Sequence, residues 1–265
     1  MFVDSHCHLS FPELHPRMTE IQAAMRAAGV DRALTICTTL EEFPQVHALA
    51  MAHANLWCTV GVHPDNEGVA EPTVDDLVRL AARPRVVAIG ETGLDYYRLN
   101  GRSIDDMAWQ RERFRVHIRA ARATGLPLVV HTRSAGGDTL RLLTEEGGGA
   151  VRGVFHCFTE TQAVADAALA MGFLISFSGI LTFRNAEALR AVARSVPLER
   201  CLIETDSPYL APVPYRGKTN QPAYVAAVAA ELARIKGLEV ADVAAATSRN
   251  FERLFRIESA LAEDS

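Results

Sequence analysis

Residues 2–9 read Phe2-Val3-Asp4-Ser5-His6-Cys7-His8-Leu9, an apolar start that predicts a strand with two histidines at its end. Side chains two positions apart on a strand point to the same face, so the imidazoles of His6 and His8 lie side by side. Imidazole is the commonest metal-donating side chain, although two surface histidines on an edge strand have the same spacing. Donors at matching places elsewhere in the chain decide between these two interpretations.

Short apolar segments alternate along the chain with longer Ala-, Leu- and Arg-rich segments of helical period. The predicted strands cover residues 2–8, 32–38, 57–63, 86–91, 127–132, 152–157, 173–178 and 201–206. The predicted helices cover residues 17–28, 41–54, 73–83, 105–124, 137–146, 160–171, 185–195, 222–236 and 239–255. Eight strands that are each followed by a helix indicate an α/β fold, a single (β/α)8 TIM barrel over residues 1–257 with a short C-terminal tail at 258–265. The alternative is a doubly wound open sheet, which favours fewer strands and a Gly-rich phosphate loop after the first one, and the sequence has no such loop.

Composition bounds the location and the partners of the protein. The five cysteines are an odd number and lie far apart, which indicates reduced thiols and not a disulfide framework. The net charge of −5 gives no global positive field, so any polyanion must be bound by local groups. The sequence contains neither a signal-peptide pattern nor a segment long enough to span a bilayer. We therefore expect a cytoplasmic monomer without membrane contact.

The ends of the predicted strands carry most of the chemically active side chains. In barrels of this kind the chemistry lies at the C-terminal ends of the strands. Five of the nine histidines fall there, together with acidic residues. Four histidines and two carboxylates are enough to hold two divalent ions that share a bridging ligand. The six candidate ligands are His6, His8, Glu91, His131, His156 and Asp206.

The alternation of side chains along a strand supports this set. It places His131 on one face of its strand, and Glu204 and Asp206 together on one face of theirs, so that each donor points into the barrel. The same alternation turns Cys7 and Cys157 away from the ligands, and we expect these two thiols to pack. The remaining histidines, expected at the surface or in packing, are His15, His47, His53 and His117.

These strand ends resemble the TatD family of metal-dependent deoxyribonucleases, which are amidohydrolase-like barrels. The matching segments are VDSHCHL at 3–9, GVHP at 61–64, GETGLDYYR at 90–98, LPLVVHTR at 126–133, FHCF at 155–158, SFSGILTFRNAE at 176–187, ETDSPYLAPVPYRGKTNQP at 204–222 and the Asn250-Phe251-x-x-Leu254-Phe255 close. The resemblance implies a metal-dependent hydrolase acting on ester bonds, a deoxyribonuclease with 3'-5' exonuclease action on single-stranded DNA. It also implies the same six metal ligands.

The expected mechanism uses two divalent ions, of which Zn2+, Mn2+ and Mg2+ are all compatible with the donors. We expect one ion at His6, His8, Glu91 and Asp206, and the other at Glu91, His131 and His156, with Glu91 as the bridge. A water between them would drop in pKa from about 15.7 towards about 7. Glu91 and Asp206 are therefore the predicted catalytic residues. Asp206 is expected to orient the water and carry a proton, the alternative being a purely structural ligand.

Further residues are predicted around the ligands. Glu204 and Asp4 each stand two positions before a ligand, where a carboxylate either holds an imidazole or is satisfied by the backbone. The predicted substrate-binding residues on the same rim are His63, Asp95, Tyr96, Arg133, Arg216 and Lys218. The three cations among them are candidates for phosphate contacts, or else solvated loop charges. Tyr96 and Tyr97 are candidates for stacking on a base, although one of them is as readily a packing residue.

Two other functions fit parts of this pattern. The same site suits hydrolysis of a carboxylic ester or amide, as in a D-aminoacyl-tRNA deacylase. Barrel hydrolases of cyclic amides or phosphotriesters often bridge their metals with a carboxylated lysine at a strand end, whereas Glu91 occupies the fourth strand end here. A metal-dependent scaffolding protein is the third reading; it predicts lost ligands, and all six are present in the sequence.

Overall fold

The computed structural model describes residues 1–257, and in this part of the chain eight parallel strands form one sheet in the order β1 to β8. The strands are β1 (Phe2–Cys7), β2 (Val30–Thr35), β3 (Leu56–Val60), β4 (Val86–Asp95), β5 (Leu128–Arg133), β6 (Gly153–Phe155), β7 (Leu174–Phe177) and β8 (Cys201–Ile203). The predicted single-domain (β/α)8 barrel is confirmed, with each strand close to its expected place. The predicted tail at 258–265 lies outside the described residues.

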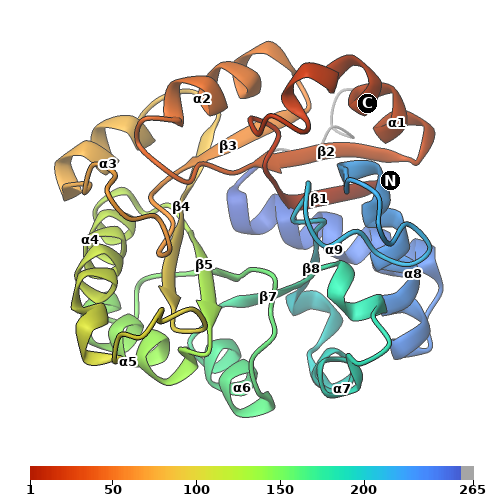
Figure 1. Ribbon diagram of the computed structural model, residues 1–265. Helices are drawn as coiled ribbons and strands as arrows, with labels where there is room; N and C mark the ends of the chain where they lie inside the picture. The colour runs from red at the N-terminus through yellow and green to blue at the C-terminus, as the bar shows by residue number, and fades with distance from the viewer. Residues whose placement is uncertain (258–265) are drawn as a thin grey trace.

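Helices surround the strands and form the outer layer of the barrel (Figure 1). The α-helices are α1 (Met18–Ala27), α2 (Phe43–Ala52), α3 (Val74–Ala81), α4 (Ala108–Thr124), α5 (Gly136–Gly147), α6 (Gln162–Ala170), α7 (Glu187–Ser195), α8 (Val225–Lys236) and α9 (Val240–Phe255). Short 3-10 helices cover His15–Arg17, Asp105–Met107, Gly179–Thr182, Leu198–Arg200 and Pro222–Tyr224. Within residues 1–257, every helix is too short or too polar to cross a membrane.

Local sequence signals explain several helix boundaries. The Thr73 side chain accepts a hydrogen bond from the Asp76 backbone N–H, and the Asp76 side chain accepts one from the Thr73 backbone, a capping box that begins α3. Helix α4 ends at Thr124 and is capped by Gly125, whose φ of 68° is left-handed and suits glycine. Helix ends of this kind fix the residue at which the loop to the next strand begins, and thereby help to position that strand.

The barrel closes where β1 meets the end of β8. The backbone N–H of Asp206 donates to the His6 carbonyl at 2.9 Å, and the N–H of His8 donates to the Ser207 carbonyl at 2.8 Å. Asp4 strengthens this seam, because its carboxylate accepts from both the N–H of Thr205 at 2.9 Å and the Thr205 hydroxyl at 2.6 Å. Closure therefore joins the first and the last predicted ligands.

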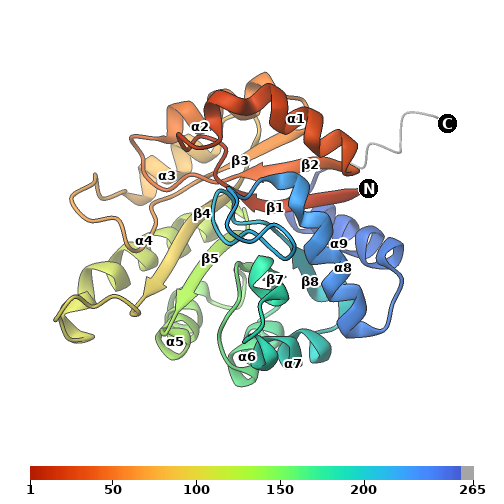
Figure 2. The same cartoon turned by 45° about the vertical axis from the view of Figure 1, so that its right-hand side comes forward.

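The interior of the barrel changes from apolar at one end to polar at the other. At the starts of the strands, inward-pointing side chains form one apolar cluster with α9, which lies across this end (Figure 1). Its members include Val3, Leu34, Ala88, Val129, Val154, Leu174, Leu202, Phe251 and Phe255. At the opposite end, the long connection from β8 to α8 folds over the barrel mouth (Figure 2). Burial of the apolar end fixes the backbone that holds the polar end in place.

Candidate metal centre

A cavity of about 790 Å³ opens at the C-terminal ends of the strands. Five of the six predicted ligands line it. The sixth, His6, is fully buried, and its ring stacks on that of His156 at a centroid distance of 3.9 Å. The fold thus brings together six side chains that are far apart in the sequence, at the strand ends where they are predicted.

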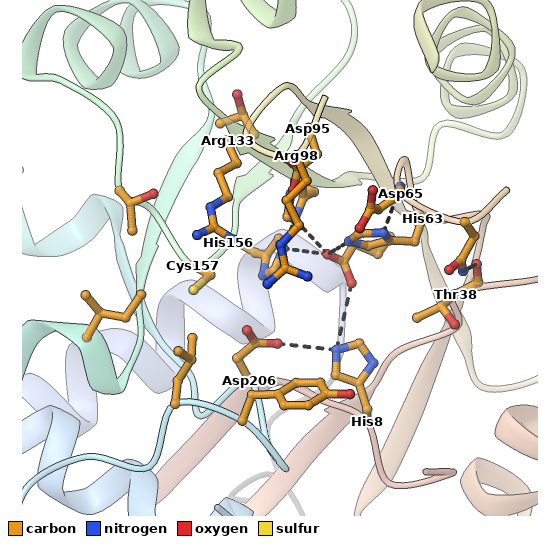
Figure 3. A pocket seen from close by; sticks show the side chains of 18 of the residues that line it. His8, Thr38, His63, Asp65, Asp95, Arg98, Arg133, His156, Cys157 and Asp206 are labelled. Atoms are coloured by element: carbon orange, nitrogen blue, oxygen red, sulfur yellow. Dashed lines mark hydrogen bonds and ion pairs between the residues drawn. The ribbon is translucent and has the colours of Figure 1, made fainter. Parts of the chain in front are cut away.

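Four of these side chains form a first donor group. The Nε2 atoms of His6 and His8 are 3.3 Å apart. Oε2 of Glu91 lies 3.3 Å from Nε2 of His6, and Oδ1 of Asp206 lies 3.3 Å from Nε2 of His8. Asp206 and His8 face each other across one side of the cavity in Figure 3. Two imidazoles and two carboxylates therefore present one atom each to the same small volume.

The other carboxylate oxygen of Glu91 belongs to a second donor group. Oε1 of Glu91 lies 2.7 Å from Nε2 of His156 and 3.2 Å from Nδ1 of His131. Nε2 of His63 is 3.3 Å from the same oxygen. We predicted His63 as a substrate-binding residue, and the structure places it among the donors. Glu91 thus connects both groups through its two oxygens.

The approach of β3 to β4 depends on glycine. A Cβ added to Gly61 would lie 2.6 Å from the Cα of Gly90, closer than packed atoms allow. The absence of a side chain at Gly61 lets the loop after β3 lie directly against the strand that carries Glu91. This contact explains why His63, two residues further on, reaches the Glu91 carboxylate.

The donor atoms fit divalent cations. Three sets of three ligand atoms lie within 4.8 Å of one another, namely those of His6, His156 and Asp206, of His6, His8 and Glu91, and of His63, Glu91 and His131. Within residues 1–257, Oε2 of Glu91 is buried without a hydrogen-bond partner. A buried carboxylate oxygen without a partner is costly, and a bound cation removes that cost.

The electrostatics of the centre favour an ionised Glu91. Burial opposes its charge, but the neighbouring imidazoles of His156, His63 and His6 outweigh burial and hold the pKa of Glu91 well below its usual range. Burial likewise opposes ionisation of Asp206, while the hydrogen bond from His8 lowers its pKa below the usual value. Both carboxylates are therefore anionic at neutral pH, as metal ligands must be.

Acidic side chains behind the donors orient two of the imidazoles. Oε1 of Glu204 lies 3.2 Å from Nδ1 of His156, which leaves Nε2 of that ring facing Glu91. Oδ2 of Asp95 lies 2.9 Å from Nε2 of His131, which leaves Nδ1 facing the centre. Asp4 contacts the backbone N–H of His6 at 3.3 Å, and its other contacts are with Thr205. Of the two alternatives given for these carboxylates, Glu204 contacts an imidazole, whereas Asp4 contacts backbone N–H groups and the Thr205 hydroxyl.

Comparison with known proteins identifies the family. The model of the family described as "TatD related DNase" matches residues 3–256. The chain belongs to the TatD family. It is 48% identical over 261 residues to an uncharacterised metal-dependent hydrolase, YcfH, of Escherichia coli, with 97% of this chain and 96% of that protein covered.

Two further TatD-family relatives extend the likeness. A protein of Citrobacter rodentium named 3'-5' ssDNA/RNA exonuclease TatD is 36% identical over 244 residues, covering 90% of this chain and 91% of the relative. The crystal structure of YjjV, a TatD homologue from Escherichia coli, superimposes with a TM-score of 0.89 at 27% identity and covers 97% of this chain and 98% of that one.

Among the predicted substrate-binding residues of this TatD-family site, Arg133 lines the cavity and stacks its guanidinium on the Tyr97 ring at 3.7 Å. Tyr96 does not line it within the described residues, because the Tyr96 hydroxyl donates to Asp138 at 2.8 Å on the outer side of the strand end. Tyr96 is thus the packing residue of the pair, and Tyr97 the exposed one.

The loop cations predicted after the last strand are placed differently from Arg133. In the described part of the chain, neither Arg216 nor Lys218 belongs to the cavity lining. The Arg216 guanidinium lies over the Phe183 ring at 3.9 Å, and Lys218 lies 5.9 Å from the Tyr215 ring. These cation–π contacts hold both side chains on the outer surface of the loop.

Cys157 also departs from the prediction. It lines the cavity, with its Sγ 3.2 Å from the Ser178 hydroxyl, whereas Cys7 is fully buried as expected. The reason is local: β6 ends at Phe155, and Cys157 has a φ of 42°, so the alternation of a strand no longer applies there. Burial raises the pKa of the Cys157 thiol well above its usual value, which keeps it protonated.

Several cavity residues were not predicted from the sequence. Arg98 lines the cavity beside Arg133, and the two side chains reach toward His156 from the same side (Figure 3). Phe11 and Tyr209 line another wall, and the Phe11 ring stacks on that of His8 at 4.6 Å. All three lie in loops, where no periodic pattern marks an inward side chain. The only signal for Arg98 was its place in the segment 90–98.

Proposed function

We propose that this metal-dependent hydrolase cleaves phosphodiester bonds of DNA, as a 3'-5' exonuclease on single strands, with two divalent ions. The observation that carries the proposal is Glu91, whose two carboxylate oxygens reach two separate donor groups at the floor of one cavity. The relative named as a 3'-5' ssDNA/RNA exonuclease supports the choice of nucleic acid.

The ions are expected at the two groups that Glu91 connects, one at His6, His8 and Asp206 and the other at His131 and His156, with His63 as an additional donor. Divalent ions bound there supply Lewis acidity, which activates water and offsets negative charge on a phosphoryl oxygen. Zn2+, Mn2+ and Mg2+ remain the candidates.

Asp206 has the position expected of the residue that orients the water. It lines the cavity with 15% of its side chain exposed, and its Oδ1 is held 3.3 Å from His8. Because its pKa lies below the usual value, the carboxylate can accept a hydrogen bond from water at neutral pH. Glu91, at 2% exposed, is more deeply enclosed and serves as the bridging ligand.

The upper walls of the cavity suit a single nucleic acid strand. Arg98 and Arg133 supply the local positive charge that the chain, at −5 overall, lacks as a whole. Phe11 and Tyr209 offer aromatic faces on the opposite wall, and 53% of Tyr209 is exposed. Aromatic faces stack on unpaired bases in proteins that bind single strands. His63 and Asp95, predicted to contact substrate, also line the cavity, and their side chains contact Glu91 and His131.

The test is a parallel assay of metal-loaded protein on single-stranded DNA labelled at either end, RNA and D-aminoacyl-tRNA. Asp206→Asn is the test variant and Asp75→Asn, an exposed change on α3, is the matched control. We expect stepwise shortening of DNA from the 3' end, lost in Asp206→Asn and kept in Asp75→Asn. Release of the amino acid from D-aminoacyl-tRNA without cleavage of any nucleic acid chain would show that the protein is a deacylase and not a nuclease. Cleavage that persists unchanged in Asp206→Asn would contradict the proposal.

A further inference from the structure

A second cavity, of about 510 Å³, lies at the end of the barrel opposite the metal centre, where β5 to β8 begin. Apolar side chains, among them Leu126, Val151, Leu174 and Leu254, form part of its lining. Five arginines line it as well, and no aspartate or glutamate of residues 1–257 does. The arginines are Arg122, Arg152, Arg200, Arg253 and Arg256.

Three of the five guanidinium groups of this arginine cavity donate to backbone carbonyls, and none of the five is paired with a carboxylate of residues 1–257. Nη1 of Arg122 donates to the Glu146 carbonyl at 2.8 Å, and Nη2 of Arg253 donates to the Glu199 carbonyl at 2.8 Å. By contrast, Arg119, which lies outside the cavity, pairs with the Glu146 carboxylate at 2.9 Å. For the five arginines of the cavity, no carboxylate within the described range 1–257 comes within the 4.0 Å distance of an ion pair.

Two of the arginines converge on one glycine. Nη1 of Arg200 lies 3.4 Å from the Gly172 carbonyl, and a Cβ added to Gly172 would lie 3.0 Å from Nη1 of Arg152. Gly172 has a φ of 87° and precedes β7, while Arg152 and Arg200 precede β6 and β8. Three neighbouring loops thus bring two like charges to the same glycine, and an anion bound beside them would reduce their repulsion.

Helix ends account for only part of the cluster. Arg122 and Arg253 lie in the last turns of α4 and α9, where a cation is favoured by the helix dipole. Arg152 and Arg200 lie outside the last turn of any α-helix of the described chain and still line the same cavity. Their convergence is the feature that helix electrostatics leaves unexplained.

We propose that the arginine cavity binds a small ligand that carries two or more phosphate groups. Guanidinium groups bind phosphate oxygens in pairs, and several of them around one space suit a multiply charged anion. The volume lies within the range of small-molecule sites, and the apolar lining suits the non-phosphate part of such a ligand. The site is at the other end of the barrel from Glu91, so it is independent of the proposed nuclease function.

Titration calorimetry of the full-length, metal-loaded protein with pyrophosphate, at constant ionic strength, tests the proposal. Arg152→Gln with Arg200→Gln is expected to weaken one binding event at least tenfold. Arg26→Gln with Arg194→Gln, which makes the same charge change in the last turns of α1 and α7, is the matched control and is expected to keep that event. Arg98→Gln with Arg133→Gln, at the metal centre, is also expected to keep it.

Equal pyrophosphate binding by the Arg152/Arg200 variant and its control would overturn the proposal. A second arm replaces pyrophosphate by a ten-nucleotide single strand. If Arg152 and Arg200 matter for that strand and not for pyrophosphate, the cavity contacts a nucleic acid backbone and the small-ligand proposal is wrong. Should the double variant fail to fold, Arg152→Gln alone serves, because within residues 1–257 that exposed side chain makes no hydrogen bond.

Discussion

Asp206 and His6 meet twice, once through the backbone and once through their side chains. The Asp206 N–H donates to the His6 carbonyl at 2.9 Å, and Oδ1 of Asp206 lies 3.6 Å from Nε2 of His6. The first contact closes the barrel between β1 and β8, and the second belongs to the donor group. Because the same two residues make both contacts, occupation of the donor group is expected to stabilise the closure of the barrel.

Removal of divalent ions is therefore expected to lower the free energy of unfolding. A ligand that binds only the folded state contributes about 2.7 kcal/mol when its concentration is a hundred times its dissociation constant. Thermal unfolding with chelator, and again after an excess of Mn2+ or Zn2+ is returned, measures the effect. Asp206→Asn is expected to gain less from the returned metal. Identical unfolding curves with and without metal would contradict this link.

The contact between Glu204 and His156 leads to a second prediction. Glu204→Gln keeps the shape of the side chain but removes the charge that holds Nδ1 of His156, 3.2 Å away. We expect metal affinity to fall about 10- to 100-fold, as is usual when the carboxylate behind a ligating imidazole is lost. Competition with a coloured chelator measures this affinity. Glu199→Gln, an exposed change just before the start of β8, is the control; equal affinities in the two variants would show that Glu204 does not act through the imidazole.

Arg133 and Arg216 were predicted from the same reasoning but occupy different places. Arg133 lines the cavity, whereas Arg216 lies over Phe183 on the outer surface. Arg133→Gln is expected to lower kcat/KM on single-stranded DNA about tenfold. The slope of log kcat/KM against log salt concentration is expected to become shallower by about one, the value for one lost phosphate contact. Arg216→Gln is expected to change kcat/KM less than twofold. The assignment of substrate contacts fails if the two variants show the same loss.

A buried histidine behind the site predicts a pH dependence of stability. Nε2 of His117 accepts from the Val62 N–H at 3.0 Å, and burial lowers the pKa of His117 from 6.5 to about 4. The unfolded chain binds this proton more tightly, so the contribution is fully present above pH 6.5 and is lost as the pH falls toward 4. The shift corresponds to about 3 kcal/mol.

Urea unfolding of the wild type and of His117→Gln at several pH values measures this contribution. Between pH 6.5 and pH 4 the wild type is expected to lose more stability than the variant, because glutamine does not titrate. His15→Gln, which alters an exposed histidine, is expected to follow the wild type. Parallel pH curves for the wild type and His117→Gln would rule out His117 as the cause.

The sequence was sufficient to predict the barrel and to bring the six candidate ligands together at one end of it, because the alternation of strands and helices shows where each strand ends. Strand alternation places His131 correctly, since β5 runs without interruption to Arg133. It also places Asp206 in the cavity, although β8 ends at Ile203 and Asp206 has a φ of 56°. The position predicted for Asp206 was right, but its cause is the backbone hydrogen bond between Asp206 and His6 and not the alternation of β8.

The remaining errors lie where the backbone leaves the strand. Cys157 was wrongly turned outward because its φ of 42° reverses the alternation. Tyr96 and Arg98 follow β4 in the same loop, yet one is buried and the other lines the cavity, a difference set by contacts such as that of Tyr96 with Asp138. Such contacts join elements distant in the sequence and have no local signature.

Metal content tests the central claim, that Glu91 joins two ion sites, most directly. Elemental analysis of protein loaded with Mn2+ or Zn2+ and freed of excess by gel filtration gives the number of ions per chain. We predict two ions per chain in the wild type and at most one in Glu91→Gln, with Glu199→Gln retaining two. One ion per chain in the wild type, or two in Glu91→Gln, would contradict the account.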